Sequence, residues 1–204
     1  MSWVQNVNIT ALISSNIDLV LAYIGETFIS AKLANMAIPR EELFTMPTIL
    51  SVAQLAWLAG FIDADGTINA QIVKRDDYIL KYQVRVTVTL FQSTKRHHIL
   101  LCIQKLFHQG TVRKRHDGMS EFCIVGQKQV EDAVTAILPY LILKRRQARL
   151  VLQITKKLPY TKDPLVLLEA CKLADKIGSL TDGKRRANTS KQVYETLQEL
   201  GHDV

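Results

Sequence analysis

The sequence predicts an α+β fold in which an antiparallel sheet carries its helices on one face. Apolar residues recur at three- and four-residue spacing in several segments, which indicates amphipathic helices, and alternate with polar residues in others, which indicates half-buried strands. The middle of the chain has the order helix, strand, strand, helix, strand, strand, helix, and extra helices follow at the C-terminal end. Strands that succeed one another through short turns pair as antiparallel neighbours and leave one face for the helices.

The chain divides by charge into an N-terminal extension, residues 1–50, and a main domain, residues 51–204. The extension holds two Lys/Arg against four Asp/Glu, and a helix is expected at 18–35. Its role stays open between a DNA-contacting arm, a helix packed on the core and an upstream start of translation. The sequence therefore predicts no function for the extension.

The main domain opens with Ser51 and Gln54, which have the spacing of a capping box, so a helix is expected from there to about Ala64. Two strands joined by a polar hairpin follow, at 67–74 and 82–90, and the second alternates regularly over its whole length. The further elements are expected as a helix at 95–107, strands at 110–115 and 121–125, and helices at 127–138, 145–158, 165–177 and 189–200.

The sheet face turned away from the helices is expected to be polar and basic. Arg, Gln and Asn side chains read the edges of bases, and a two-stranded ribbon fits the major groove of DNA. An ordinary solvated face is the equally open alternative on alternation alone. The residues expected on this face are Asn69, Gln71, Arg75, Gln83, Arg85, Thr87, Thr89, Arg113, Arg115 and Glu121.

The composition favours a polyanionic partner. The formal net charge is +7, and 24 Lys/Arg against 15 Asp/Glu lie after residue 50, which favours nucleic acid or an anionic surface. No uninterrupted apolar run approaches the ~20 residues of a spanning helix, so no membrane partner is expected. No basic residue precedes Lys32, so neither a secretory signal nor a transit peptide is supported. Cys102, Cys123 and Cys171 lack the spacing of zinc and redox sites and are expected as reduced core thiols.

The first predicted helix combines small residues with two carboxylates. Ala56, Gly60 and Asp63 recur at three- or four-residue spacing and leave a flat stripe along which a second helix can approach. Asp65 falls at the C-terminal end, where the helix dipole disfavours a carboxylate by up to about 1 kcal/mol and a divalent cation reverses the sign. The alternative is a buried helix end followed by Gly66. Asp63 is expected to cap this end rather than to bind metal.

The same segment reads LAGFIDADG from Leu58 to Gly66 and differs from the letters LAGLIDADG only at Phe61. It resembles the LAGLIDADG homing endonuclease family, and its single copy resembles the homodimeric branch that includes chloroplast intron enzymes. The resemblance covers about residues 55–200. It implies a saddle-shaped antiparallel sheet and a site-specific endonuclease that, as a homodimer, hydrolyses phosphodiester bonds of double-stranded DNA in a long pseudo-palindromic site.

The resemblance implies Mg²⁺ as the metal, held by the Asp65 carboxylate and the backbone carbonyl of Ala64. Mn²⁺ is expected to substitute, Ca²⁺ to support binding without cleavage, and no small-molecule cofactor is expected. The remaining catalytic positions of the family fall on Gln92, for the attacking water, and on Arg96 and Lys144, for charge on the phosphate. Taken singly, these three are also ordinary loop, helix-start and surface residues.

The resemblance also assigns DNA contacts to three basic places. Arg113 with Arg115 would contact bases, the basic residues of 144–149 would contact central phosphates, and those of 184–186 would contact the flanking backbone. Solvated charged faces are the ordinary alternative for such runs. Besides the polar sheet residues, the expected DNA contacts are Val73, Tyr78, Thr111, Cys123, Arg146, Lys184 and Arg185.

Other functions stay open on the sequence alone. An intron RNA maturase or a DNA-binding protein without cleavage would keep the same fold, and a structural protein would use the helix stripe for dimerisation only. The four catalytic positions argue against a loss of cleavage. The expected location is an organelle, chloroplast or mitochondrion, if an intron there encodes the protein, and the cytoplasm otherwise. The target sequence does not follow from side-chain types, because DNA deformability also sets base preference.

Overall fold

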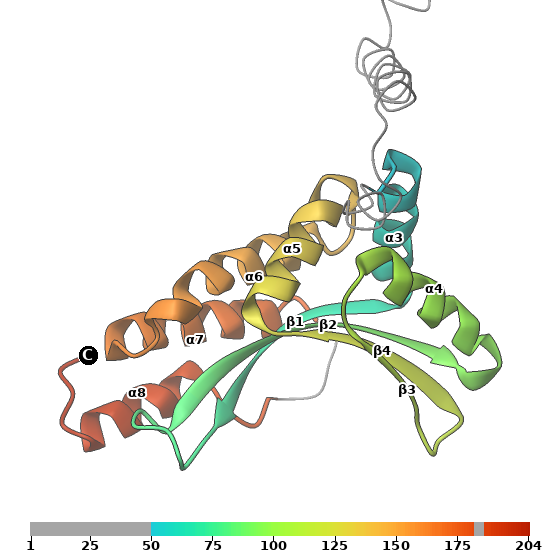
Figure 1. The fold of residues 1–204 in the computed structure, drawn as a ribbon. Helices are drawn as coiled ribbons and strands as arrows, with labels where there is room; N and C mark the ends of the chain where they lie inside the picture. The colour runs from blue at the N-terminus through green and yellow to red at the C-terminus, as the bar shows by residue number, and fades with distance from the viewer. Residues whose placement is uncertain (1–49, 182–185) are drawn as a thin grey trace, which may run out of the picture. The chain divides into compact units, whose positions relative to one another are not determined.

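The computed structural model describes residues 50–181 and 186–204. The helix expected at 18–35 and the basic residues Lys184 and Arg185 lie outside the described residues. The described chain has the predicted α+β order (Figure 1). Its main elements are α3 (Val52–Asp65), β1 (Gly66–Lys74), β2 (Tyr82–Ser93), α4 (His97–Phe107), β3 (Thr111–Lys114), β4 (Met119–Val125), α5 (Gln127–Ile137), α6 (Arg145–Lys157), α7 (Pro164–Gly178) and α8 (Ser190–Glu199).

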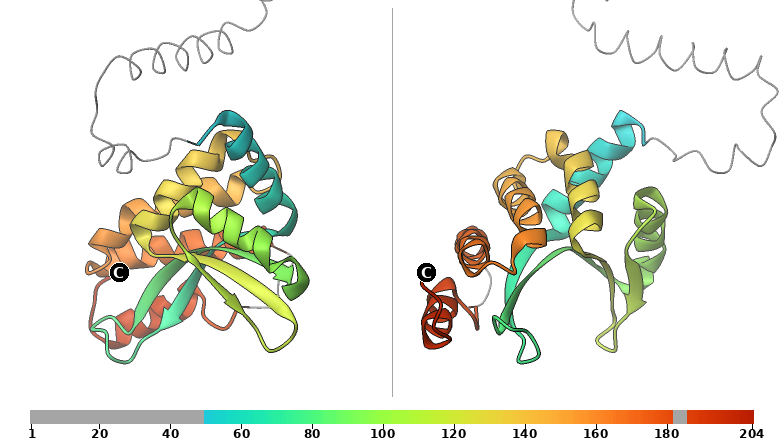
Figure 2. Two further views of the ribbon diagram at one scale, coloured as in Figure 1. Left: turned by 45° about the vertical axis from the view of Figure 1, so that its right-hand side comes forward. Right: turned by 60° about the vertical axis from the view of Figure 1, so that its left-hand side comes forward.

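The strands form one antiparallel sheet in the order β1-β2-β4-β3. The β1–β2 hairpin is the longest pairing, and its register runs from Gly66 opposite Leu90 to Lys74 opposite Tyr82. Figures 1 and 2 show that the sheet is arched, that α4 to α7 lie over its convex face, and that its concave face stays open. The segregation of the helices and the saddle shape of the sheet are thus confirmed.

The core lies between the convex face of the sheet and the helices. Along β2 the alternating side chains from Tyr82 to Leu90 are all buried, as the period of the sequence predicts. Val134 of α5, Ile154 of α6 and Leu167 of α7 are fully buried on the helical side. Each large aliphatic side chain buried in this way stabilises the fold by about 1.5–3 kcal/mol.

The central strand is three residues longer than predicted. The predicted end was Leu90, but β2 continues to Ser93 and places the apolar Phe91 on the polar face. The ring of Phe91 is covered there by the guanidinium of Arg115, which lies 5.5 Å from the ring centroid. Ser93 pairs with Met119, so β4 also begins earlier than predicted. The cation–π contact resolves the apparent break in the pattern.

The helix expected at 95–107 begins later, at His97, after a 3₁₀ turn at Thr94–Arg96. Its side chains Leu100, Ile103 and Phe107 are buried in the core. The other helices begin and end within two residues of their predicted bounds. None of the helices in the described ranges is long and apolar enough to cross a membrane.

The prediction of three core thiols is wrong for two of them. Cys171 is fully buried in α7, and burial raises the pKa of its thiol to about 12. Cys102 is exposed on α4 and Cys123 is half-buried on the concave sheet face. The sequence placed all three inside because free cysteine is among the most buried residue types. All three are free thiols.

Candidate nucleic-acid interface and catalytic centre

Helix α3 is fixed by a capping box at its N-terminal end and by a glycine at its C-terminal end. The Ser51 hydroxyl accepts from the Gln54 backbone N–H and the Gln54 side chain accepts from that of Ser51, as predicted. At the other end the Gly66 N–H donates to the carbonyl of Ile62, and the chain turns directly into β1. Asp65 is therefore held at the junction of helix and sheet.

A side chain at Gly66 would disturb this junction. A Cβ atom there would lie 2.8 Å from the backbone Cα and carbonyl oxygen of Ile62 and 3.0 Å from a methyl of Leu90. We expect Gly66→Ala to lower the free energy of unfolding by roughly 1–3 kcal/mol, because backbone and core atoms must move apart. Thermal unfolding followed by circular dichroism measures the loss. A melting temperature equal to that of the unchanged protein would contradict this close approach.

Three of the predicted catalytic residues form one hydrogen-bonded chain. The Gln92 Nε2 donates to Asp65 Oδ2 at 2.6 Å, and the Arg96 Nε donates to Gln92 Oε1 at 2.7 Å. Gln92 lies within β2, not after it as predicted, and is 6% exposed because it continues the core-facing row of the strand. Asp65 and Arg96 are exposed. This series of hydrogen bonds fixes the Asp65 carboxylate through Oδ2. Among the described residues, no hydrogen-bond donor binds the other oxygen, Oδ1.

The fourth predicted residue, Lys144, contacts the same helix end. Lys144 precedes α6, and its ammonium group donates to the backbone carbonyl of Asp63, two residues before Asp65. Sequence positions 65, 92, 96 and 144 thus converge on the junction of α3 with the sheet. Two cationic groups near an exposed carboxylate suit the binding of a phosphate together with a metal ion.

Asp63 was predicted to cap the end of its own helix, but the structure gives it other partners. Its carboxylate accepts backbone N–H groups of Ile142 at 2.6 Å, Leu143 at 3.1 Å and Lys144 at 2.9 Å, all in the loop before α6. It is 8% exposed. The loop holds three donors that lie almost 80 residues away in sequence, which is why local spacing did not predict the contact. Asp63 is a clamp between α3 and the α6 loop.

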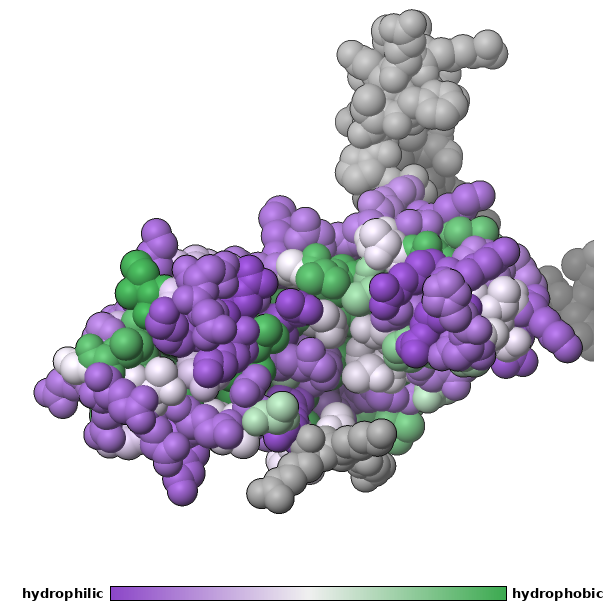
Figure 3. Space-filling view, turned by 90° about the horizontal axis from the view of Figure 1, so that it is seen from below, coloured by the Kyte–Doolittle hydropathy of each residue, from purple (hydrophilic) through white to green (hydrophobic). Residues whose placement is uncertain are grey.

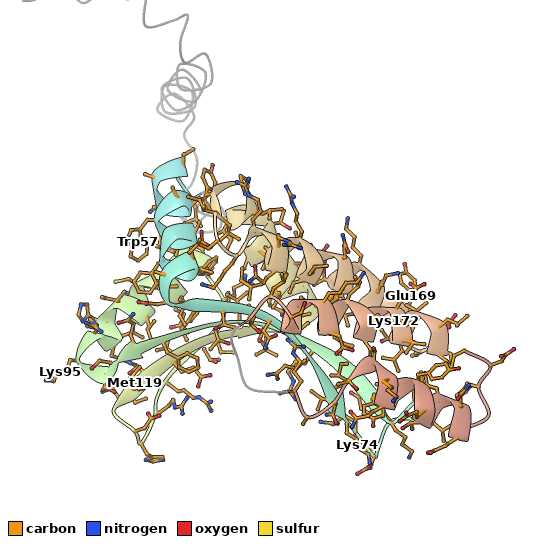
Figure 4. All side chains as sticks on the ribbon, turned by 180° about the vertical axis from the view of Figure 1, so that it is seen from behind. Trp57, Lys74, Lys95, Met119, Glu169 and Lys172 are labelled. Carbon is orange, nitrogen blue, oxygen red and sulfur yellow. The ribbon has the colours of Figure 1, made fainter. Side chains whose placement is uncertain are left out.

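The contacts of Asp63 also change which residues of α3 are available to a second helix. Asp63 is buried against its own protomer, whereas Ala56 and Gly60 are exposed along with Ala53 and Ala64. A Cβ at Gly60 would meet nothing within 4 Å. Trp57, 46% exposed, lies on the side of α3 opposite to α5 and α6 (Figure 4). The open small-residue face of α3 therefore excludes Asp63 and includes Ala64.

The concave sheet face forms a hollow whose lining contains most of the predicted DNA-reading residues. Seen from below, this side of the molecule is mostly hydrophilic (Figure 3). Thr67, Phe91 and Val125 also line it and were not predicted. The predicted residues in the lining are Asn69, Gln71, Arg85, Thr87, Thr89, Thr111, Arg113, Glu121 and Cys123.

The arginines on this face differ in their surroundings. Arg85 is exposed and opposes Gln71 across the β1–β2 pair. Arg113 donates to Glu121 at 2.7 Å, and Arg115 forms an ion pair with Asp117 at 2.9 Å besides covering Phe91. Among the described residues, Arg85 has no ion-pair partner. It is therefore the arginine of this hollow best placed to meet a new partner.

The other predicted contacts lie at the margins. Val73 and Gln83 pair near the hairpin end of the sheet. Arg75 lies beyond β1 in the hairpin, where it bonds Asp77 at 3.1 Å and covers the Tyr78 ring at 5.2 Å. Its prediction as a sheet-face residue is corrected accordingly. Arg146 is exposed in the first turn of α6.

One member of the third basic run is not a surface cation. Arg186 is half-buried, and its guanidinium donates to the carbonyl of Ala70 at 2.6 Å, that of Ala174 at 2.9 Å and the Asn69 Oδ1 at 2.7 Å. Burial lowers the pKa of Arg186 and the charge of Asp175 opposes this. Three of the five guanidinium donors of Arg186 thus bind acceptors within the fold, so its predicted contact with flanking DNA backbone stays a prediction that this arrangement disfavours.

The metal ligands at this centre come from few protein groups. Within 50–181 and 186–204, no three His, Cys, Asp or Glu side chains are grouped as a metal site. The available ligands are the open oxygen of Asp65 and the backbone carbonyl of the exposed Ala64. Both are hard oxygen donors, which suit Mg²⁺ or Ca²⁺, and Mg²⁺ commonly takes one or two carboxylates and fills its shell from substrate phosphates and water. The donor set fits a metal shared with a nucleic-acid substrate.

Comparison with known proteins places these features in a wider group. The sequence model described as LAGLIDADG endonuclease matches residues 58–151. The DNA endonuclease I-CvuI of Chlorella vulgaris is 65% identical over 151 residues, which cover 74% of this chain and 94% of that protein. The DNA endonuclease I-CreI of Chlamydomonas reinhardtii is 37% identical over 147 residues, covering 72% and 90%.

Solved structures agree with the sequence matches. A crystal structure of I-CvuI in complex with its target in the presence of Ca has a TM-score of 0.73 at 64% identity and covers 74% of this chain and 97% of that one. A second, with the I-CreI target in the presence of Mg and DNA not cleaved, has a TM-score of 0.74 with the same identity and coverage. Each match thus takes in almost the whole of the I-CvuI chain and about three quarters of this one.

Proposed function

The chain belongs to the LAGLIDADG endonuclease family, and from that premise we propose that it is a homing endonuclease that cuts both strands of a specific DNA site. One observation carries the proposal. An exposed carboxylate, Asp65, held by Gln92, lies where the open face of α3 meets a basic, polar sheet hollow. A cutting centre and a reading surface therefore adjoin in one protomer.

The active form in this proposal is a homodimer. The sequence carries one copy of the motif, and the small-residue face of α3 is exposed in the protomer. Two α3 helices packed along Ala56 and Gly60 would approach closely, because neither residue holds side-chain atoms beyond Cβ. The packing would bring two Asp65 carboxylates to the two-fold axis. Each protomer would then cut one strand.

The cleavage chemistry is metal-assisted hydrolysis of a phosphodiester. Mg²⁺, held by Asp65 and the Ala64 carbonyl, would polarise the phosphate and supply a nucleophile at neutral pH. Mn²⁺ substitutes in this proposal, and Ca²⁺ supports DNA binding without cutting. No small-molecule cofactor is invoked.

The chain's own residues prepare the site for that chemistry. Gln92 holds Asp65 through its amide N–H and keeps its own oxygen on Arg96, so neither carboxylate nor guanidinium rotates freely. The water that attacks the phosphate would be oriented beside Gln92. Arg96 and Lys144 would offset the negative charge that accumulates on the phosphate oxygens in the transition state.

The sheet would read a half-site of the DNA. β1 has 9 residues and spans roughly 30 Å at about 3.3 Å per residue. That length matches about nine base pairs at about 3.4 Å each. The arched concave face (Figure 1) would lie along the duplex, and the two halves of a dimer would read a pseudo-palindromic site.

Selection of cut sites from a randomised DNA library in Mg²⁺ tests the proposal, with EDTA added to a parallel sample. We expect a single long, two-fold related site cut on both strands, and no cutting in EDTA. Specific binding without cutting would instead support a non-cleaving DNA-binding protein, and binding of intron RNA alone would support a maturase. Sedimentation at the same protein concentration measures the expected dimer.

The Arg85 guanidinium is expected to contact a base. Arg85→Ala should relax the preference at one position of each half-site by about 1–3 kcal/mol, because a bidentate Arg–guanine contact discriminates by that amount. Binding to single-position variants of the selected site measures the effect. Lys172→Ala, which removes the same charge from α7 on the helical side (Figure 4), is the matched control and should leave every position unchanged. A uniform loss of affinity over all sequences would make Arg85 a phosphate contact.

The proposed location rests on the sources of the two relatives, because Chlorella vulgaris and Chlamydomonas reinhardtii are algae with chloroplasts. We infer an organellar gene carried inside a chloroplast or mitochondrial intron, with the protein acting in that compartment. An open reading frame lying outside any intron would contradict this part of the proposal.

A further inference from the structure

The segment that leads into α8 is tied to the first strand by two side chains. Arg186 donates to the backbone carbonyl of Ala70 at 2.6 Å and to Asn69 Oδ1 at 2.7 Å. Asn188 donates to the backbone carbonyl of Ile72 at 3.0 Å. Both side chains therefore attach the segment to β1. Of these contacts between described residues, only the one from Arg186 to Asn69 involves a side chain of the concave face.

The contact fixes how Asn69 is oriented. A guanidinium group has donors and no acceptor, so the atom of Asn69 that faces Arg186 must be the carboxamide oxygen. Arg186 stays protonated at neutral pH although burial lowers its pKa, so the contact is charge-assisted. The NH₂ group of Asn69 is left to face the hollow that this residue lines with Gln71 and Arg85. Asn69 thus presents donors only.

A free asparagine reads adenine by two hydrogen bonds, because its NH₂ donates to N7 and its oxygen accepts from N6. The bond to Arg186 fixes the direction of the Asn69 oxygen, so Asn69 cannot turn both carboxamide atoms toward adenine at once. Guanine presents two acceptors, O6 and N7, and cytosine presents only the N4 donor in the major groove. A side chain that only donates therefore favours guanine over adenine and disfavours cytosine.

We propose that Arg186 is a positioning residue that makes Asn69 a donor-only reader of one base in each half-site, with guanine preferred there. This inference rests on the proposed function, because it requires the concave face to read DNA. It assigns base preference to a residue that lies 117 positions from Asn69 in the sequence and has its donors inside the fold. Arg186 acts through Asn69 and makes no contact with DNA in this account.

The test compares variants in binding to a half-site randomised at the position that Asn69→Ala makes indifferent. Arg186→Met should raise the adenine-to-guanine ratio at that position about tenfold, because the freed oxygen restores the adenine contact. Asn188→Ala is the matched control, since it releases the other tether without touching Asn69, and should leave the ratio unchanged. A shift of equal size in Asn188→Ala, or none in Arg186→Met, overturns the proposal.

Asn69→Asp supplies a second test that keeps Arg186 in place, and it decides the matter if Arg186→Met does not fold. A carboxylate would keep the bond to Arg186 and present an acceptor to the hollow, so cytosine should become the preferred base. An unchanged guanine preference overturns the inference. Failure of the unchanged protein to select any DNA site would instead sink the proposed function, whereas specific cutting without these shifts would sink only the role of Arg186.

Discussion

We expect Asp65→Asn to abolish DNA cleavage and to leave DNA binding measurable in Ca²⁺. The substitution removes the negative charge that holds a divalent metal but keeps an oxygen able to accept from Gln92 Nε2, which lies 2.6 Å away in the unchanged protein. A metal ion supplies several kcal/mol of transition-state stabilisation, and each 1.36 kcal/mol is a factor of ten in rate. We therefore expect cleavage to fall about 10³-fold or more.

The measurement is single-turnover cleavage of the selected site in Mg²⁺, beside equilibrium binding in Ca²⁺. Asp132→Asn is the matched control, because this carboxylate is exposed on α5 and pairs with Lys128, away from the centre. It should cut at the normal rate. Normal cutting by Asp65→Asn would remove Asp65 from the catalytic centre, and loss of binding together with cleavage would make it a structural residue instead.

The sequence predicted correctly those parts of the fold that depend on the pattern of neighbouring residues. The alternation of β2 and the capping box at Ser51 each depend on neighbouring residues alone, and both are confirmed. The break in alternation at Phe91 could not be interpreted locally, because Arg115 lies on the β3–β4 hairpin. A pattern that ends early in the sequence can therefore continue in the structure when a distant side chain covers the exception.

The same distinction applies to the candidate site. The motif placed Asp65 at a helix end, and the structure has it there. The clamp of Asp63 on the loop before α6 and the bond of Arg186 to Asn69 span about 80 and 117 positions. In the sequence, a charged residue near a glycine or in a basic run looks the same whether its side chain faces solvent or bonds backbone groups within the fold. The partners of Asp63 and Arg186 depend on how the fold brings distant segments together, which the local sequence does not show.

Asp63 and Asp65 should therefore respond to mutation in opposite ways. Asp63→Ala leaves the backbone N–H groups of Ile142, Leu143 and Lys144 without their acceptor. Hydrogen bonds to a charged group contribute about 1.5–3 kcal/mol each, but water reaches part of this loop because Ile142 is 82% exposed. We expect the free energy of unfolding to fall by about 2–4 kcal/mol, as measured by urea denaturation.

Cleavage should fall further in Asp63→Ala than the loss of folded protein explains, because the freed loop carries Lys144 away from the helix end. Asp63→Asn should be intermediate in stability, since one oxygen still accepts while the NH₂ group opposes a backbone donor. Asp65→Asn, which removes no acceptor from a backbone N–H, should unfold at the same urea concentration as the unchanged protein. Equal stability of Asp63→Ala would show that the loop does not need the clamp, and a destabilised Asp65→Asn would show that the two carboxylates are not divided between structure and chemistry.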